Sequence, residues 1–289
     1  MSSHLDPPLA DVRALVQRSL VEDLTPLGDL TASLLDPDLW ADGEFVAREQ
    51  GVVAGRLCVV ETFAAVDTRL TLDWELPDGT SVAPGQRIAT ARGPLATMLT
   101  AERTALNFLS HLSGVATSVR TYVDRADGGA RIWDTRKTTP GLRSLQKAAV
   151  RAGGGVNHRG NLSDWVMVKD NHLAGMTIAE LVGVARERWP ARTIHVECDR
   201  PEQVVQAVDA GADALLLDNM TPDEVRACVA LVDGRCLVEA SGGIDLDTVA
   251  AYARTGVDLL SVGHITNSAP VLDIGLDITP DGVVDRGED

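Results

Sequence analysis

The strongest constraint on the fold is a regular alternation of two kinds of segment between about residues 131 and 266. Short apolar runs, each followed by polar residues or glycine, read RIWDT, DWVMVKDN, TIHVECD, ALLLDN, CLVEASGG and LLSVGHIT. The segments between the later runs have the spacing of amphipathic helices and read TIAELVGVARERWP, PEQVVQAVDAG, TPDEVRACVALV and DLDTVAAYARTG. Pro201 and Pro222 stand where a first helical turn accepts proline. Strands that alternate with helices predict a parallel sheet.

The polar residues at the strand ends favour one kind of parallel sheet over another. They follow every apolar run on its carboxyl side, as expected for the shared mouth of a closed α/β barrel. We therefore predict an α/β barrel domain over residues 114–270. An open, doubly wound sheet is the alternative.

The first part of the chain predicts a smaller α+β domain of residues 1–113. Apolar residues recur at helical spacing over 11–21, and short alternating runs with turn signals such as Asp78-Gly79 then indicate antiparallel strands. A long helix follows residue 94 and is expected to break near Gly114. Its apolar positions are Leu99, Leu106, Leu109 and Leu112. The last stretch, 271–289, is expected to return to this domain and to end in disordered residues.

Charge and composition exclude several classes of partner. The chain carries 26 Lys and Arg against 42 Asp and Glu, a formal net charge of −16, and its pI is near 4.7. Such a field repels nucleic acids and anionic membranes, so neither is expected as a partner. No apolar run is long enough to span a bilayer, and the N-terminal residues do not resemble a signal peptide. The four cysteines form no Cys-x-x-Cys pair, which predicts buried thiols and a cytoplasmic location.

Positive charge gathers in one stretch of this acidic chain, from Arg131 to His172. The stretch contains three acids against eight basic residues, of which Arg143, Lys147 and Arg151 are expected on a helix surface. The eight are Arg131, Arg136, Lys137, Arg143, Lys147, Arg151, Arg159 and Lys169. This pattern is typical of a site for a ligand with several negative groups, such as a dicarboxylate together with a pyrophosphate.

The carboxyl ends of barrel strands open into one mouth, so the residues there are candidate site residues. In chain order they are Asp134, Arg136, Lys137, Lys169, Asp170, Glu197, Asp218, Glu239, Ser241, Gly263 and His264. Any single one is equally well explained as a solvated charge, but ionisable or small residues at six strand ends favour a site. Glu197 and Asp218 suit sugar hydroxyls or a Mg²⁺ ion that arrives with a pyrophosphate.

Glycine-rich turns near the strand ends favour phosphate binding. Ser241-Gly242-Gly243 follows a strand and precedes a helix, where backbone N–H groups can converge on a phosphate, and Gly263 closes the next strand. A tight turn is the simpler alternative for a single SGG. Gly153–Gly155, which precedes His158 and Arg159, is either a linker or backbone brought close to a ligand. The chain has no Walker A loop and no H-E-x-x-H, and the spacing of His and Cys predicts no zinc site.

Several stretches form one recognisable set. They read AERTALNFLSHLSGVAT, DTRKTTPGLRSLQKAAVRAGGGVNHR, LSDWVMVKDNH, LLLDNM, EASGGI and GVDLLSVG. Together they resemble the quinolinate phosphoribosyltransferase family, from about residue 22 to residue 278. The resemblance implies an N-terminal open α/β sandwich followed by an incomplete α/β barrel of fewer than eight strands. It also implies a homodimer with shared active sites, or a higher oligomer built from it.

The resemblance implies phosphoribosyl transfer from phosphoribosyl pyrophosphate to quinolinate with decarboxylation, which gives nicotinate mononucleotide for NAD biosynthesis. The residues implied to bind the two quinolinate carboxylates are Arg136, His158, Arg159 and Lys169. Lys137 and Lys169 are implied to reach the pyrophosphate. Glu197 and Asp218 are implied to hold ribose hydroxyls and Mg²⁺, the implied cofactor, directly or through the substrate. The implied catalytic residues are Lys137, Lys169, Glu197 and Asp218.

Further implied contacts concern the phosphate and the partner subunit. The residues implied to take the 5′-phosphate are Ser241, Gly242, Gly243 and Gly263. Arg103, in the AERT motif, is implied to reach the neighbouring subunit's site, and an exposed helix charge is the alternative. The chain departs from the family pattern where His195 replaces a usual Glu, His264 a usual Ala and Asn267 a usual His. His264 either adds a phosphate hydrogen bond or fills space, and HRGNLSD replaces the more usual HRLGLSD.

Three alternatives to this function remain at the level of sequence. A Schiff-base lyase would use Lys169 at a strand end, but its many cationic neighbours count against it. A relative of the same fold with a molybdenum-linked role shares the RKT and GGG elements, whereas the intact AERT and KDNH motifs favour the quinolinate enzyme. A non-catalytic sensor of phosphorylated ligands would gain little from the two carboxylates at Glu197 and Asp218.

Overall fold

The computed structural model describes residues 4–282 and divides into two compact units. The first comprises Met1–Ser118, Thr139–Gly154 and Ser268–Asp289, and the second Val119–Thr138 and Gly155–Asn267. The expected domain boundary at 113/114 lies inside a continuous helix, and residues 139–154 group with the first unit instead of the barrel. The expected disorder at the end of the chain concerns residues outside the described range.

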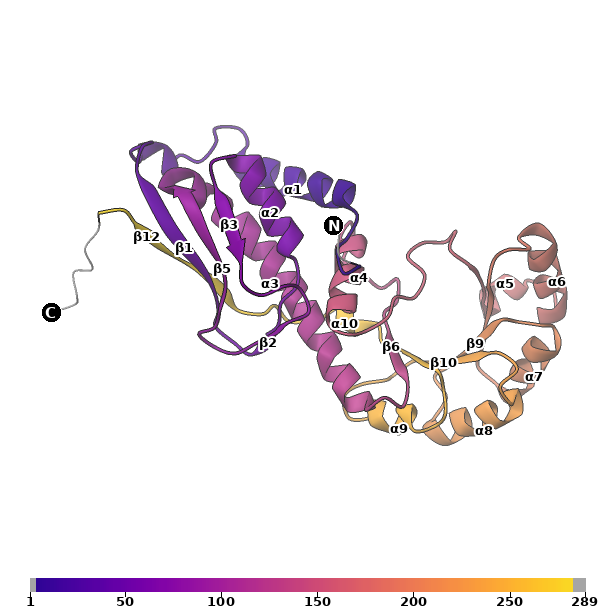
Figure 1. Cartoon of the computed structure of the whole chain (residues 1–289). Helices are drawn as coiled ribbons and strands as arrows, with labels where there is room; N and C mark the ends of the chain where they lie inside the picture. Colours follow the sequence, from indigo (N-terminus) through magenta and orange to yellow (C-terminus); the bar gives the residue numbers. More distant parts are fainter. Residues whose placement is uncertain (1–3, 283–289) are drawn as a thin grey trace. The chain divides into compact units, whose positions relative to one another are not determined.

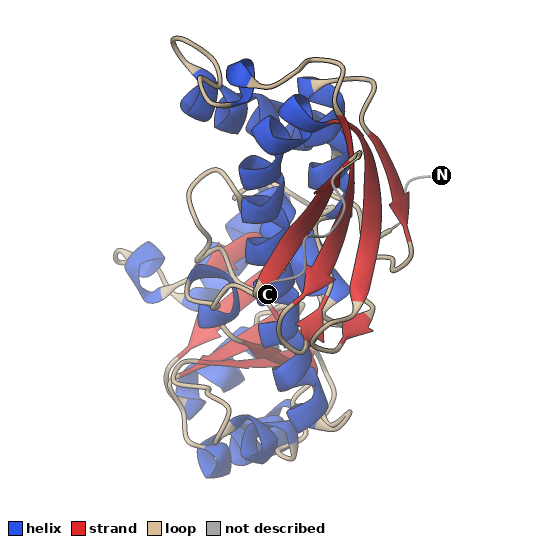
Figure 2. Cartoon of the chain, turned by 90° about the vertical axis from the view of Figure 1, so that its left-hand side faces the viewer, coloured by secondary structure: helices blue, strands red, loops and turns tan. Residues whose placement is uncertain are grey.

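The first unit is built on an antiparallel sheet of four strands in the order β12-β1-β5-β3 (Figures 1 and 2). The strands are β1 (Trp40–Ala47), β3 (Thr71–Trp74), β5 (Arg87–Pro94) and β12 (Ile274–Pro280). Strand β12 pairs with β1 from Ala41↔Pro280 to Ala47↔Ile274. A separate two-stranded pair consists of β2 (Gly51–Val52) and β4 (Ser81–Val82). Strand β12, from the end of the described chain, is therefore an edge strand that pairs with β1, the first strand in the sequence.

Helices cover one face of this sheet and make the core of the first unit (Figure 2). The helices of the unit are α1 (Leu9–Leu24), the 3₁₀ helix η1 (Ala32–Leu34), α2 (Arg56–Val66), α3 (Leu95–Ala126) and α4 (Arg143–Ala152), although α3 continues into the second unit. Phe45 of β1, Phe63 of α2 and Met98 of α3 are among the fully buried side chains of this core. Each contributes about 1.5–3 kcal/mol by leaving water.

Helix α3 runs unbroken through Gly114, so the expected break there is wrong. Glycine is needed here for another reason. A Cβ at this position would lie 2.9 Å from the Cα of Val271 and closer still to the carbonyl oxygen of Pro270. Glycine thus allows the returning C-terminal segment to cross the helix. Leu106, Leu109 and Leu112 are buried as expected, whereas Leu99 is 38% exposed.

The turn at Asp78-Gly79 is present, with Gly79 at φ +92°, where glycine is favoured. The carboxylate of Asp78 accepts the backbone N–H groups of Gly55 at 3.1 Å and Arg56 at 3.2 Å, where α2 begins. The strands on either side of the turn do not pair with each other, since β3 pairs with β5 and β4 with β2. The turn therefore passes the chain between two sheets and caps a helix.

The second unit contains six parallel strands in the order β6-β11-β10-β9-β8-β7. They are β6 (Arg131–Trp133), β7 (Val166–Val168), β8 (Ile194–Cys198), β9 (Ala214–Asp218), β10 (Leu237–Ser241) and β11 (Leu259–Ser261). The order does not reverse, as it would in a doubly wound sheet, and β6 and β7 form the two edges. The prediction of an incomplete barrel with fewer than eight strands is confirmed.

Helices alternate with the strands of the second unit (Figure 1). They are α5 (Asp170–Leu173), α6 (Ile178–Arg188), α7 (Pro201–Asp209), α8 (Pro222–Val232), α9 (Val249–Ala253) and α10 (His264–Asn267). The expected helix starts are present, with Pro201 and Pro222 in first turns. Thr221 and Glu224 form a capping box at the start of α8, which satisfies N–H groups that the helix itself leaves open. No helix in the described range is long and apolar enough to cross a membrane.

Candidate active site

The carboxyl ends of the parallel strands surround a cavity of about 410 Å³ in the second unit. Four cations and three carboxylates are among the side chains that line it. The lining residues are Thr135, Arg136, Lys137, His158, Arg159, Met167, Lys169, Glu197, Leu216, Asp218, Glu239, Ser241 and Ser261. A cavity of this size holds a small molecule, and its ionisable side chains suit a ligand that carries several charges.

The structure brings most of the expected site residues together at this cavity. Those that line it are Arg136, Lys137, His158, Arg159, Lys169, Glu197, Asp218 and Ser241. Gly242, Gly243, Gly263 and His264 belong to the same unit and follow its strands, but they are not lining residues. Arg103 lies in the first unit, on α3, with its side chain 67% exposed. The cavity is also lined by Thr135, Met167, Leu216 and Ser261, for which the sequence carries no specific signal.

Asp134 anchors the loop that carries His158 and Arg159. Its side chain is fully buried and accepts hydrogen bonds from the Asn157 side chain at 2.7 Å and from the backbone N–H of His158 at 2.9 Å. Backbone bonds between residues 132–134 and Val156 add to this attachment. Asp134, a candidate site residue by its place at a strand end, thus positions its neighbours.

Arg136 and Arg159 place two guanidinium groups at the cavity. Arg159 is 8% exposed. Burial, followed by the positive charge of Arg136, lowers the pKa of Arg159 from its ordinary value. Two like charges held at a partly dehydrated surface are relieved by an anion that binds between them. The pair is therefore suited to a carboxylate or phosphate group.

Lys169 and Glu197 form an ion pair at the ends of β7 and β8. The backbone N–H of Lys169 donates to Nδ1 of His172 at 2.9 Å, which fixes the backbone at the point where α5 begins. Glu197 also faces Asp218, because its charge is the second cause, after burial, that raises the pKa of Asp218. The cavity thus contains two carboxylates whose mutual repulsion a bound cation would reduce.

The turn after β10 depends on glycine. Gly242 has φ +92° and Gly243 has φ +64°, a region that other residues rarely adopt. A Cβ on Gly242 would lie 2.8 Å from the backbone nitrogen of Asn219, whereas one on Gly243 would meet nothing within 4 Å. Asn219 in turn donates to the Asp218 carboxylate at 2.7 Å. The SGG turn is therefore packed against the residue that follows Asp218.

Gly263 and His264 follow β11 and have different surroundings. A Cβ on Gly263 would lie 2.9 Å from Cδ of Lys137, so glycine allows the lysine chain to pass close to the backbone. Thr266 reinforces this approach by donating to the Lys137 carbonyl oxygen at 2.8 Å. The exposed His264 contacts the hydroxyl of Tyr122 through its Nε2 atom. The contact that the structure describes for His264 is thus with Tyr122 of α3.

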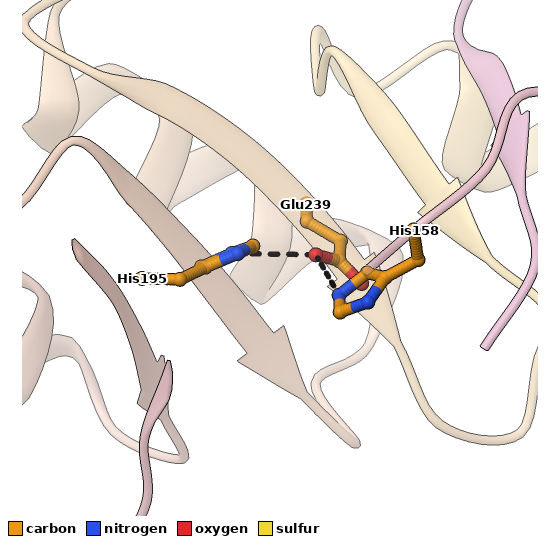
Figure 3. Close-up of side chains that lie close together, drawn as sticks. All are labelled: His158, His195 and Glu239. Carbon is orange, nitrogen blue, oxygen red and sulfur yellow. Dashed lines mark ion pairs between the residues drawn. The ribbon is translucent and has the colours of Figure 1, made fainter. Parts of the chain in front are cut away.

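Two lining residues, His158 and Glu239, form a compact buried group with His195, shown in Figure 3. Nε2 of His195 and Nε2 of His158 lie 3.3 Å and 3.6 Å from the same oxygen of Glu239. Burial lowers the pKa of His195 from its ordinary value, although the adjacent charge of Glu239 opposes this. Burial opposes ionisation of Glu239, but the two adjacent imidazoles outweigh it, and the pKa of Glu239 lies below its ordinary value. Glu239 is a strand-end residue for which the sequence alone indicates no specific role.

Other candidate features lie in the first unit. A cavity of about 520 Å³ there has a single ionisable lining residue, Asp29, and so lacks a catalytic set among the described residues. The basic residues of α4 are not all on a helix surface as expected, because Lys147 is only 6% exposed. Arg151 donates to backbone carbonyl groups of residues 4–6. These charges of the basic stretch therefore serve packing in the first unit.

Comparisons with known proteins agree along nearly the whole chain. Residues 29–113 match the family model described as quinolinate phosphoribosyl transferase, N-terminal domain, and residues 115–277 match the model of its C-terminal domain. The chain is 40% identical over 271 residues to a probable nicotinate-nucleotide pyrophosphorylase [carboxylating] of Bacillus subtilis, covering 93% of each chain. It is 41% identical over 275 residues to a nicotinate-nucleotide pyrophosphorylase [carboxylating] of Mycobacterium leprae, covering 92% of this chain and 96% of the relative.

A solved structure supports the same relationship. The nicotinate-nucleotide pyrophosphorylase from Francisella tularensis superposes with a TM-score of 0.92 at 35% sequence identity, covering 96% of this chain and all of the other. Because both the antiparallel and the parallel sheet are included in that coverage, the likeness extends to the architecture of the two units.

Proposed function

Because this chain belongs to the quinolinate phosphoribosyltransferase family, we propose that its barrel cavity is where it joins quinolinate to the phosphoribosyl group of phosphoribosyl pyrophosphate. The enzyme is a decarboxylating phosphoribosyltransferase of NAD biosynthesis, and its products are nicotinate mononucleotide, pyrophosphate and CO₂. The observation that supports the location most directly is the convergence of four cations and two opposed carboxylates, Glu197 and Asp218, at one cavity.

The cations hold the anionic groups of both substrates. Arg136 and Arg159, with His158 beside them, bind the two carboxylates of quinolinate, which offsets the repulsion between the guanidinium groups. Lys137 and Lys169 reach the pyrophosphate and stabilise the charge that develops on it as it leaves. Both substrates are thereby fixed for attack of the ring nitrogen on the anomeric carbon, and catalysis consists mainly of positioning and electrostatics. Alkylation of the ring nitrogen then makes loss of the adjacent carboxylate easier.

Glu197 and Asp218 serve the ribose side of the reaction. Their carboxylates bind ribose hydroxyls and lie near the positive charge that develops on the sugar. Hard oxygen ligands of this kind fit Mg²⁺, and the raised pKa of Asp218 beside Glu197 is consistent with a site that a cation relieves. When bound, Mg²⁺ neutralises charge on the pyrophosphate. The turn of Ser241, Gly242 and Gly243 offers backbone N–H groups to the 5′-phosphate, together with Gly263.

The alternative activities have weaker support. A Schiff-base lyase needs a neutral amine at Lys169, whereas the ammonium group is engaged by Glu197. A sensor that only binds phosphorylated ligands would not need the carboxylates Glu197 and Asp218 among the cations. Neither alternative explains why the family relationship extends over both units.

The proposed enzyme is a homodimer that completes its sites across subunits. Arg103 is exposed on α3, and within the described part of the chain its ion-pair contact is a weak one with Glu102 at 3.7 Å, so its guanidinium is available to a second chain. We assign it to the neighbouring subunit's quinolinate site, and a higher oligomer would be assembled from such dimers. The four cysteines are free thiols, which suits a reducing compartment, and the cytoplasm is the proposed location.

One assay tests the proposed function and its location. The protein is incubated with quinolinate, phosphoribosyl pyrophosphate and Mg²⁺, and CO₂ and nicotinate mononucleotide are measured. Arg136→Ala should lose saturation with quinolinate while keeping its fold by circular dichroism. Arg226→Ala, which removes an exposed guanidinium on α8, is the matched control and should keep wild-type turnover. Wild-type turnover in Arg136→Ala would show that the quinolinate site lies elsewhere.

A further inference from the structure

His158, His195 and Glu239 come from three separate segments and meet at one point of the second unit (Figure 3). His195 lies in β8, Glu239 in β10, and His158 in the loop that Asp134 anchors. One ligand atom from each lies within 4.8 Å of the other two. The side chains are 7%, 1% and 0% exposed, so the group is a feature of the interior.

Two members of this group have unsatisfied polar atoms. No hydrogen bond of standard geometry within the described residues reaches Nε2 of His195 or either carboxylate oxygen of Glu239, although the side chains of His158 and Ser261 lie close enough to Glu239 to lower its pKa. The 3.3 Å approach between them therefore lacks the geometry of a hydrogen bond. Buried polar atoms without partners are rare because each costs about 1–3 kcal/mol, and such atoms point to a missing ligand.

We propose that His158, His195 and Glu239 form a binding site for a zinc-type divalent transition-metal ion. Two imidazole nitrogens and one carboxylate oxygen are a donor set that zinc accepts with three protein ligands and one open position. Zinc bonds of about 2.0–2.1 Å in a tetrahedron place neighbouring ligand atoms roughly 3.3 Å apart. The separations of 3.3 Å and 3.6 Å between each imidazole and Glu239 are close to this value, and the two imidazole nitrogens lie within 4.8 Å of each other.

The surroundings of the group suit a metal site. His158 and Glu239 line the cavity, so the group borders a space that a small ion can enter. The His195 ring also hydrogen-bonds the backbone of Leu215, and such outer contacts orient metal-binding imidazoles. Trp133 and Trp165 hold the ring of His158, with centroids 5.2 Å and 4.8 Å away.

This site differs in chemistry from the one proposed for Mg²⁺. Mg²⁺ prefers oxygen ligands and near-octahedral geometry, which Glu197 and Asp218 with substrate oxygens can offer. Imidazole favours zinc and related ions. Because His158 is also proposed to contact quinolinate, zinc at this site should inhibit turnover, a consequence that rests on the proposed function. Zinc binding itself does not rest on the proposed function, because it is measured without substrate.

The test measures metal binding to protein that carries no affinity tag. After dialysis against a chelator, the protein is titrated with Zn²⁺, and bound metal is counted by mass spectrometry after gel filtration. We expect about one ion per chain. His195→Phe and the isosteric Glu239→Gln should weaken binding by more than the 10- to 100-fold that loss of an outer contact costs. His4→Ala, which removes an exposed imidazole, is the control and should bind as the wild type does.

Two further measurements keep the outcome decisive. Co²⁺ bound to the wild type should give the intense visible absorption of four-coordinate geometry, which does not depend on either variant folding. Excess Mg²⁺ should not displace zinc. Stoichiometric binding that survives both His195→Phe and Glu239→Gln, displacement by Mg²⁺, or no zinc bound to the wild type would each overturn the proposal. If the wild type turns over quinolinate and zinc inhibits it, Glu239→Gln should lose both zinc binding and zinc inhibition. A wild type that binds zinc but shows no turnover would instead contradict the proposed function and leave the metal site intact.

Discussion

Alanine at Gly242 should damage the enzyme far more than alanine at its neighbour Gly243. Both glycines have positive φ, +92° and +64°, so each substitution costs about 1–2 kcal/mol in backbone strain. Only at Gly242 does the new methyl group also collide, since it would lie 2.7 Å from Cγ and 2.8 Å from the backbone nitrogen of Asn219. Asn219 must move, and it is the residue that follows the cavity carboxylate Asp218.

The difference between the variants can be estimated from the contacts of Asn219. Its side chain donates to Asp218 at 2.7 Å, and its backbone N–H donates to the Ser241 carbonyl at 2.9 Å. Each hydrogen bond contributes about 0.5–1.5 kcal/mol, so Gly242→Ala should lose about 1–3 kcal/mol more stability than Gly243→Ala. At about 2 °C per kcal/mol for a chain of this size, the melting temperatures should differ by about 2–6 °C.

Steady-state kinetics supply the second readout. A catalytic group misplaced by about 1 Å costs on the order of 100-fold in rate, so kcat/KM should fall about that much in Gly242→Ala. In Gly243→Ala it should fall by less than about tenfold, because the strain adds no displacement of Asp218. Thermal unfolding and turnover are measured on both proteins in parallel. Equal losses in the two variants would refute the steric explanation and leave only backbone strain.

Three further predictions concern single side chains. Burial raises the pKa of Asp218 above its ordinary value of 3.8, so the folded state favours the protonated carboxyl group. The folded protein pays no penalty for Asp218 below pH 3.8, and it loses stability as the pH rises from there through the folded-state pKa. Asp218→Asn should therefore unfold at higher urea than the wild type at pH 7 but not at pH 3, despite losing turnover; an equal gain at both would contradict this. Burial raises the pKa of Cys58 and of Cys198 to about 12, so neither should react with a thiol reagent at pH 8 until urea is added, and rapid labelling of all thiols would be inconsistent with that burial. Arg151→Ala removes hydrogen bonds to the carbonyl groups of residues 4–6 and should destabilise the first unit by about 1–2 kcal/mol, with faster proteolysis before α1; an unchanged cleavage rate would speak against this role.

The sequence pattern predicted the strands of the second unit well, because each strand is specified by its own short run of residues. A parallel strand buried on both faces must be a short apolar run, and the run ALLLD became β9 with Asp218 at its carboxyl end. The same rule placed Arg136, Lys169 and Glu197 at one cavity, since parallel strands end on the same side.

What the sequence did not reveal depends on contacts between distant segments. Gly114 looks like a helix breaker until the returning segment at Pro270 is known to cross it. The group of His158, His195 and Glu239 has no motif spacing, because its members come from a loop and two strands that do not neighbour each other in the sheet. Lys147 follows the pattern of a surface lysine but is covered by other parts of its unit.

The pairing of β12 with β1 has a consequence for the order in which the chain can fold during synthesis. Strand β1 leaves the ribosome early, but its partner at Ile274–Pro280 follows more than 200 residues later. At ordinary rates of translation this is a wait of roughly 10–40 s. The second unit, which ends at Asn267, is synthesised within that interval and can fold first. Until β12 arrives, β1 presents an open edge to other chains, so the nascent protein is exposed to aggregation throughout this interval.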